Sequence, residues 1–488
     1  MFDRPLDCLI AEHELSPDRV VREVCAVRPA QLAVLLESLP PADAAWLRAQ
    51  GFAAKSGELV KMPGEAGVAS AILGLGDAGE GPQGPYAFGG LAMALAGPSE
   101  AGEADAATPD HAAGRPVWRL ALPVDVAVND AVLGFCLGAY RFDRLRASKS
   151  VPALLAVPAG AESGAAVARA TWLARDLINM PANLLGPSEL ADTAVHTMRA
   201  FGAEARIVTG EALARDYPAI EAVGAGSARP PRVVVANWRG SKATDGAPLL
   251  SLVGKGVCFD SGGYDIKSSA GMLRMKKDMG GAAIMLALAR LVMDHDLPVR
   301  LALRLGCVEN SISGSAMRPS DVLSTRRGLS VEVGNTDAEG RLVLSDLLAE
   351  ASDESPDLLV DAATLTGAAR VALGPDLPAL FSNDDKVAQA IIDAGLTAHD
   401  PVWRLPLWDG YNEWLSSPVA DLNNVSSRPM AGAIVASLFL QRFVARSVRW
   451  AHIDTYAWND HVRPGRPEGG EALGLRAIFQ ALLPILNL

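Results

Sequence analysis

Residues 249–267 read LLSLVGKGVCFDSGGYDIK, an apolar run that passes into a segment rich in glycine and charge. The apolar run, residues 249–255, predicts a buried strand. Lys255 and Asp260 lie at and beyond the end of this run, and the glycines around them allow the backbone to turn closely around a ligand. The stretch therefore predicts a strand that leads into a binding site.

Apolar runs and helical patterns alternate on both sides of this stretch. Further strands are expected at 232–238, 299–308, 357–365 and 448–454, and helices at 280–294, 341–352, 386–395 and 432–445. Near-continuous apolar strands separated by amphipathic helices predict an α/β fold with a mainly parallel central sheet flanked by helices. In such a sheet, ligand sites form beyond the carboxyl ends of the strands.

The first third of the chain predicts a smaller α/β unit. Strands are expected at 68–73, 117–124 and 151–158, a helix over 130–146, and a surface loop around one short helix over 74–116. A long helical stretch, residues 165–180, ends before Pro181. We therefore expect two domains joined by a connector helix: residues 1–158, 159–182 and 183–488.

The composition of the chain argues against several classes of protein. The chain has 488 residues, 50% of them hydrophobic, and a net charge of −12, which disfavours attraction to nucleic acid or to an anionic membrane. The sequence contains no run of 18 apolar residues, so no membrane-spanning helix is predicted. The five scattered cysteines form no CxxC, which argues against a thiolate zinc site, and charges from the third residue argue against a secretory signal. We expect a cytoplasmic protein.

Four carboxylates lie where expected strands pass into expected helices: Asp260, Asp278, Asp337 and Glu339. A single carboxylate at such a place is usually a helix cap or a surface ion pair. Four of them at one edge of a sheet would repel each other, and two divalent cations would cancel that charge. Asp337 and Glu339 are two residues apart, so on an extended segment both side chains face the same way.

Three cations accompany these carboxylates. A metal would lower the pKa of the Lys255 amine, which could then bind it in the neutral form. Lys267 and Arg341 would remain charged and available to a substrate or a transition state. Carboxylate-rich sites of this kind suit Mn, Mg or Zn.

The same stretches resemble the signature of a known family. VGKGVCFDSGG with Lys267, MKKDMGGAA at 275–283 and NTDAEGRLVLSD at 335–346 resemble the leucyl aminopeptidase family, the M17 dinuclear metallopeptidases. Weaker similarity extends over 175–191, 361–374 and 450–454, so the resemblance spans about 165–488. In the N-terminal part only LGAYRFDRLR, before residue 147, is similar.

The resemblance implies a role for each site residue. It implies two divalent metal ions per subunit, Mn or Zn with Mg or Co as alternatives. One ion would be held by Asp260, Asp337 and Glu339, and the other by Lys255, Asp260, Asp278 and Glu339. Lys267 would polarise the scissile carbonyl, and Arg341 would hold a bicarbonate as general base. Met275 and Thr364 would line the pocket for the first side chain, and Leu365 would offer its carbonyl to the substrate.

The implied function is that of a metal-dependent aminopeptidase with residues 183–488 as the catalytic domain. It would remove the N-terminal residue, preferably Leu or another apolar residue, from short peptides with a free N-terminus through a metal-bridging water. The resemblance also implies a cytoplasmic homohexamer, with residues 1–158 serving assembly or access. Tyr264, Lys277 and Tyr456 depart from the family pattern and put the substrate preference in doubt.

Two other classes of function stay open at this point. A DNA-binding or scaffold protein could use the same fold with secondary peptidase activity, although the charge of −12 disfavours nucleic acid as a partner. A dinuclear phosphoesterase would usually bring histidines to its metals, and none of the seven histidines lies in the site motifs.

Overall fold

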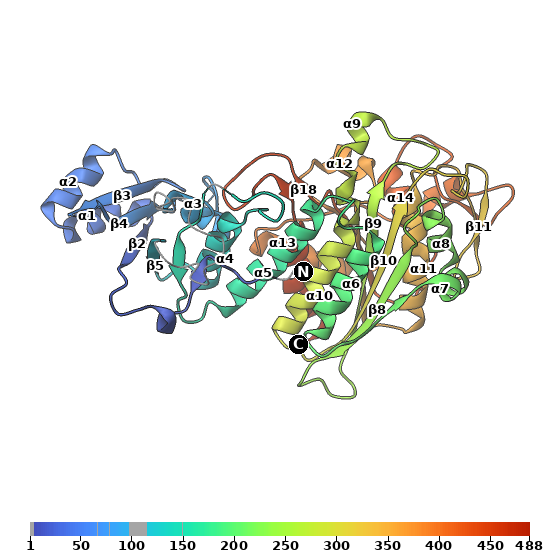
Figure 1. The fold of residues 1–488 in the computed structure, drawn as a ribbon, viewed down its shortest axis with the longest axis horizontal. Coiled ribbons are helices and arrows are strands. Elements are labelled where there is room, and N and C mark those ends of the chain that lie inside the picture. The colour runs from blue at the N-terminus through green and yellow to red at the C-terminus, as the bar shows by residue number, and fades with distance from the viewer. Residues whose placement is uncertain (1–3, 66, 78, 97–114, 149) are drawn as a thin grey trace. The chain divides into compact units, whose positions relative to one another are not determined.

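The computed structural model describes residues 4–65, 67–77, 79–96, 115–148 and 150–488. The chain forms two compact units, drawn in Figure 1. The smaller comprises residues 4–172 with 460–468, and the larger comprises 173–459 with 469–488. The boundary falls within helix α5 (Glu162–Asn179), which confirms the long helix predicted before Pro181.

The smaller unit is built on a six-stranded sheet in the order β1-β6-β5-β2-β4-β3, parallel except for the β3–β4 pair. The three predicted strands are present as β4, β5 and β6, whereas β1, β2 and β3 were not predicted. The strands are β1 (Leu9–Ile10), β2 (Val21–Val27), β3 (Leu59–Gly64), β4 (Gly67–Gly74), β5 (Val117–Ala121) and β6 (Leu154–Ala156). The helices are α1 (Leu32–Ser38), α2 (Pro41–Ala49), α3 (Leu91–Ala94) and α4 (Val128–Ala139).

Helix α4 ends earlier than the predicted range of 130–146. Tyr140 leaves the helical conformation with ψ 132°, and its ring packs edge-on against Trp172 at 5.7 Å. The buried aromatic contact therefore outweighs the helical spacing of the residues beyond it. Of the predicted loop at 74–116, residues 78 and 97–114 lie outside the described residues, and the short helix α3 lies within its described part.

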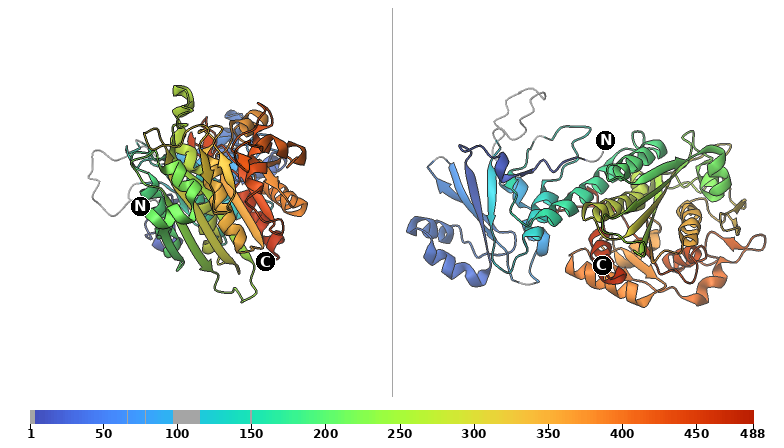
Figure 2. Two further views of the ribbon diagram at one scale, coloured as in Figure 1. Left: turned by 90° about the vertical axis from the view of Figure 1, so that its right-hand side faces the viewer. Right: turned by 90° about the horizontal axis from the view of Figure 1, so that it is seen from below.

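The larger unit is built on an eight-stranded sheet in the order β15-β14-β17-β13-β9-β10-β8-β7. The four central strands β17, β13, β9 and β10 are parallel. On one side the β10–β8 and β8–β7 pairs are antiparallel, and on the other the β17–β14 pair is antiparallel and the β14–β15 pair is parallel. The mainly parallel sheet is thus confirmed, and its twist is visible in Figure 2. The strands are β7 (Glu204–Val208), β8 (Arg232–Arg239), β9 (Leu249–Asp260), β10 (Arg300–Asn310), β13 (Leu358–Ala363), β14 (Ala379–Ser382), β15 (Trp403–Arg404) and β17 (Trp450–Asp454).

Helices cover both faces of this sheet, with α6 and α10 on one face and α8, α11 and α14 on the other in Figure 1. The apolar side chains of β9 and β13 form one core with α8, α11 and α14. The four predicted helices are present, although α14 ends at Gln441 rather than at 445. The helices are α6 (Pro187–Arg199), α7 (Gly210–Asp216), α8 (Pro218–Gly224), α9 (Ser269–Met272), α10 (Gly280–Asp294), α11 (Glu339–Asp353), α12 (Gly367–Leu373), α13 (Asp385–Thr397), α14 (Gly432–Gln441) and α15 (Leu475–Leu486). In the described ranges, no helix combines the length and apolar character that crossing a membrane requires.

Strand β9 extends beyond the predicted range of 249–255. It stays paired with β10 as far as Asp260, whereas its pairing with β13 stops at Gly254. Gly254 and Gly256, which suggested a loop, are accommodated within the β9–β10 ladder. Lys255 therefore lies inside a strand, at the level where β13 ends and the loop of Thr364 begins.

The segment VEVG before Asp337 does not belong to the central sheet. It forms strand β12 (Ser330–Glu332), which pairs with β11 (Val322–Ser324) and β16 (Leu422–Asn423) in a separate three-stranded sheet. The prediction that all four carboxylates follow strands of one sheet is therefore wrong for Asp337 and Glu339. Instead, helix α11 brings this segment to the edge of the central sheet, because its apolar face packs on β9 and β13.

Candidate active site

Three of the predicted carboxylates gather beyond the end of strand β9. Asp260 is the last residue of β9, Glu339 is the first residue of α11, and Asp337 lies in the turn before it. One oxygen of each lies within 4.8 Å of the others. Ala338 has φ −111° and ψ 37°, so the prediction of an extended segment is wrong, and a turn at the helix start brings both side chains to the same place.

Lys255 joins the fourth carboxylate to this cluster. Its Nζ lies 2.7 Å from Asp278 Oδ2 and 2.9 Å from Glu339 Oε1, and it donates to the carbonyl of Thr364 at 2.8 Å. Gly340 makes room for the amine, because a Cβ there would lie 2.6 Å from Nζ. Burial lowers the pKa of Lys255, but the surrounding carboxylates outweigh burial and raise it overall. These contacts make the amine a counter-ion of Asp278 and Glu339, and its role as a neutral metal ligand stays a prediction.

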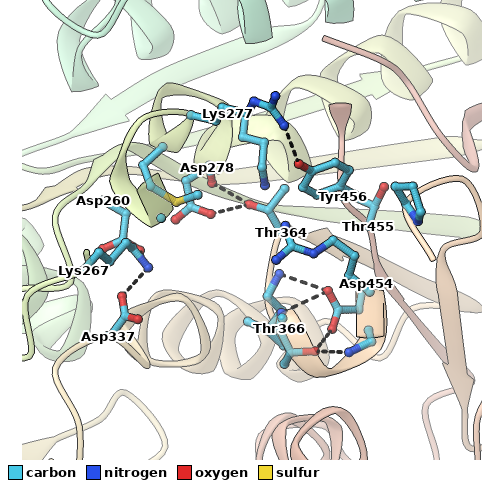
Figure 3. Close-up of a pocket in the computed structure, with 18 of the residues that line it drawn as sticks. Asp260, Lys267, Lys277, Asp278, Asp337, Thr364, Thr366, Asp454, Thr455 and Tyr456 are labelled. Carbon is cyan, nitrogen blue, oxygen red and sulfur yellow. Dashed lines mark hydrogen bonds and ion pairs between the residues drawn. The ribbon is translucent and has the colours of Figure 1, made fainter. Parts of the chain in front are cut away.

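Lys267 pairs with the other side of the cluster. Its Nζ lies 2.7 Å from Asp260 Oδ2 and also contacts Asp337 Oδ1 (Figure 3). Gly262, with φ +87°, makes the turn that returns the chain to Lys267, and a Cβ there would meet the carbonyl of Asp265 at 2.5 Å. The pKa of Lys267 is lowered by burial and raised more strongly by these carboxylates.

Two of the carboxyl groups, those of Glu339 and Asp337, have a raised pKa, which a bound cation would lower. Burial, with the charge of Asp260, raises the pKa of Glu339 to about 8 and that of Asp337 to about 6. Burial also opposes ionisation of Asp278, but the charge of Lys255 lowers its pKa overall. Glu339 Oε2 is buried and accepts no hydrogen bond from the described residues. Oxygen donors in this arrangement fit divalent cations.

A cavity of about 710 Å³ opens beside the carboxylates (Figure 3). It brings together the other predicted residues Met275, Thr364 and Leu365. Thr364 Oγ1 donates to Asp278 Oδ1 at 2.7 Å, so the wall of the cavity is tied to the carboxylate cluster. Among the residues that the structure describes, no histidine lines this cavity.

Arg341 follows Glu339 on α11 but does not line the cavity. It is buried, its Nη1 donates to the carbonyl of Asn424 at 2.6 Å, and its Nε is buried with no hydrogen-bond partner among the described residues. Burial lowers its pKa to about 10, against the raising effect of Glu339.

Sequence reasoning missed Asp454, the last residue of β17. Its carboxylate accepts hydrogen bonds from the backbone N–H groups of Leu365 at 3.0 Å and Thr366 at 3.2 Å, and from Thr366 Oγ1 at 2.6 Å. It thus fixes the loop that carries Thr364 and Leu365. The available signal was its place at the end of an apolar strand, within WAHID.

Three further residues that were not predicted hold the motifs together. Asn310 Nδ2 donates to Asp260 Oδ1 at 2.9 Å and to the carbonyl of Thr336 at 3.0 Å. Asp265 Oδ2 accepts from the backbone N–H of Thr336 at 2.7 Å. Asp265 therefore positions the segment that contains Asp337.

A family model described as the cytosol aminopeptidase family, catalytic domain, matches residues 172–479, well over half of the chain. The chain belongs to the cytosol aminopeptidase family. The resemblance to leucyl aminopeptidases is thereby confirmed, and membership makes the chain a metallo-aminopeptidase, a hydrolase of peptides. A second model, the M17 aminopeptidase N-terminal domain, matches residues 23–158.

Individual cytosol aminopeptidases are similar to this protein over most of its length. A probable cytosol aminopeptidase of Chlorobium limicola is 36% identical over 468 residues, covering 90% of this chain and 91% of the relative. The structure of the cytosol aminopeptidase from Coxiella burnetii matches with a TM-score of 0.87 and 42% identity, covering 98% and 99%. The bottromycin maturation enzyme BotP in complex with Mn matches with a TM-score of 0.81 and 34% identity, covering 95% and 99%.

Proposed function

We propose that this metallo-aminopeptidase removes the first residue of short peptides with a free N-terminus and uses two divalent cations to do so. The observation that carries the proposal is the convergence of Asp260, Asp337 and Glu339 within 4.8 Å at the edge of a large cavity. A cluster of buried carboxylates is costly without counter-charge, and two divalent ions would supply more of it than two lysines do.

The proposed ligand sets follow the geometry and the family. One cation would be held by Asp260, Asp337 and Glu339, and the second by Lys255, Asp260, Asp278 and Glu339. Manganese is the first candidate, since BotP is described in complex with Mn, and zinc is the second. When bound, such a pair supplies a nucleophile at neutral pH and polarises a carbonyl group.

The chain's own residues would do the remaining work. Lys267 would stabilise the negative charge that develops on the carbonyl oxygen, an effect typically worth several kcal/mol. Leu365 would accept a hydrogen bond from the substrate through its carbonyl, and Met275 and Thr364 would contact the first side chain. We assign bicarbonate to Arg341, whose buried Nε lacks a partner among the described residues and is the donor available to an anion.

The cytoplasmic location and homohexameric assembly implied by the family belong to this proposal, and light scattering of the purified protein tests the assembly. A preference for Leu and other apolar first residues, implied by the family as well, stays a prediction. The charged groups that line the cavity favour a different preference.

The test compares leucine p-nitroanilide with its N-acetylated form, for the native enzyme and for Glu339→Gln, with Mn²⁺ present. We expect cleavage of the free-amine substrate only, loss of activity in the variant, and weaker Mn²⁺ binding by the variant in calorimetry. Calorimetry separates loss of metal from loss of catalysis, and circular dichroism verifies that the variant is folded. Equal cleavage of the acetylated substrate would refute an aminopeptidase mechanism.

A further inference from the structure

One lysine in the cavity is not explained by the mechanism. Lys277 lies in the short 3-10 helix Met275–Met279 that also carries Asp278, and its side chain lines the cavity. Its side chain extends toward the space between Thr364 and Tyr456 in Figure 3. Only 5% of the residue is exposed, so its ammonium group is largely removed from bulk water.

Lys277 differs from the other two lysines of the cavity in lacking a polar partner. Lys255 and Lys267 each contact two carboxylates. The ammonium of Lys277 makes no hydrogen bond or ion pair with any residue that the structure describes; its close contact is the ring of Tyr456, whose centroid lies 4.7 Å from Nζ. A buried ammonium in this state is unfavourable until an acceptor reaches it.

The carboxylates near Lys277 are committed to other groups. Asp278 binds Lys255 and the hydroxyl of Thr364. Asp454 receives three hydrogen bonds from the loop of residues 365 and 366. No carboxylate among the described residues therefore pairs with the amine of Lys277 in the cavity wall, and burial lowers its pKa to about 8 against the charge of Asp278.

Further cationic groups surround the same ring. The guanidinium carbon of Arg370 lies 4.9 Å from the centroid of the Tyr456 ring, and Arg274 Nη1 donates to the Tyr456 hydroxyl at 3.3 Å. Arg274, Arg370 and Tyr456 all line the cavity. This side of the cavity is thus suited to an anionic group and poorly suited to a purely apolar side chain, which would leave the ammonium of Lys277 without an acceptor.

We propose that Lys277 is a specificity residue and that this enzyme favours peptides whose first residue carries a carboxylate, aspartate or glutamate. The inference rests on the proposed aminopeptidase function, because it assigns the cavity to the first side chain of the substrate. The carboxylate of that residue would accept hydrogen bonds from Lys277 at the wall formed with Tyr456.

The experiment compares kcat/KM for the aminomethylcoumarin amides of glutamate, glutamine and leucine on the Mn²⁺-loaded enzyme. Glutamine has the shape of glutamate without its charge, so the glutamate-to-glutamine ratio isolates the ion pair. We expect a ratio of at least about tenfold, the value of one charge-assisted hydrogen bond. Lys277→Met should reduce the ratio to about one, and Lys277→Arg should retain a preference for glutamate because it keeps the charge.

The neighbouring Lys276 provides the matched control, because it does not line the cavity and donates to the carbonyl of Asn179 at 2.6 Å. Lys276→Met should keep the native ratio. If the enzyme cleaves the leucine amide but kcat/KM for the glutamate amide is no higher than for the glutamine amide, the specificity assignment is overturned and the aminopeptidase function stands. The same holds if Lys277→Met folds and retains the native ratio. If the enzyme cleaves none of the three amides, the aminopeptidase function and this inference are refuted together.

Discussion

Asp454 offers the sharpest test of how the cavity is held in shape. Its carboxylate is 4% exposed and receives three hydrogen bonds from the loop that follows β13. That loop presents the Thr364 carbonyl to Lys255, and Leu365 lines the cavity. Replacing the carboxylate should therefore damage the active site without removing any proposed metal ligand.

The size of the effect follows from these hydrogen bonds. Asp454→Ala removes all three acceptors, and because the donors are partly buried we expect a loss of about 1 kcal/mol for each, or about 3 kcal/mol of unfolding free energy. Asp454→Asn keeps one acceptor oxygen for the two N–H groups, and its amide can donate to the Thr366 hydroxyl, so we expect a loss of about 1 kcal/mol. A loop displaced by about 1 Å should lower kcat/KM by about 100-fold in the alanine variant and less in the asparagine variant.

Urea unfolding and kcat/KM, measured on the native enzyme and both variants, provide the assay. The alanine variant should bind Mn²⁺ with less than a tenfold change in affinity, since the three clustered carboxylates remain. Two results contradict the reasoning. An alanine variant with native kcat/KM would show that the loop needs no anchor, and an asparagine variant as impaired as alanine would show that charge, rather than hydrogen bonding, is what Asp454 supplies.

Further predictions concern the packing and charge of the same unit. Gly340→Ala places a Cβ 2.6 Å from the amine of Lys255, so activity should fall at least tenfold, whereas Gly246→Ala, with no atom within 4 Å, should match the native enzyme in the same assay. Arg175→Met removes the guanidinium group that lies 2.9 Å from the buried carboxylate of Glu471 and should cost about 3 kcal/mol in urea unfolding, part of which the added change Glu471→Gln should restore. Burial raises the pKa of Glu339 to about 8, so protons compete with the metal for this carboxyl group below that pH. Calorimetry should therefore show Mn²⁺ binding at least about tenfold weaker at pH 6 than at pH 8. Equal affinity at both values would show that this carboxyl group is ionised throughout.

The central fold could be predicted because its signals are local. Each central strand is an apolar run bounded by polar residues, and the covering helices that were predicted, α10, α11 and α14, have apolar spacing over at least ten residues. The limits of β9 could not be predicted in this way. Gly254 and Gly256 have the composition of a loop, but pairing with β10 extends the strand to Asp260, and such long-range pairing leaves no local signal. In the smaller unit β1 was missed for a related reason, since it has only two residues and is held by pairing with the distant β6.

The candidate site shows which chemistry a sequence can reveal. Asp260, Asp337 and Glu339 were expected together because their spacing matches a known motif, and the structure brings them within reach of one another, although Asp337 arrives from a different sheet. The sequence marked Lys277 as a departure that bears on substrate preference, but the acidic preference that we propose could not be predicted, because it depends on the partners that the lysine lacks among the described residues. A lysine is neutralised only if a nearby carboxylate is not already bound to another group. The groups that decide this come from segments as far apart as residues 255 and 454. A motif therefore identifies the reaction, whereas the hydrogen-bond inventory of the folded cavity indicates the substrate.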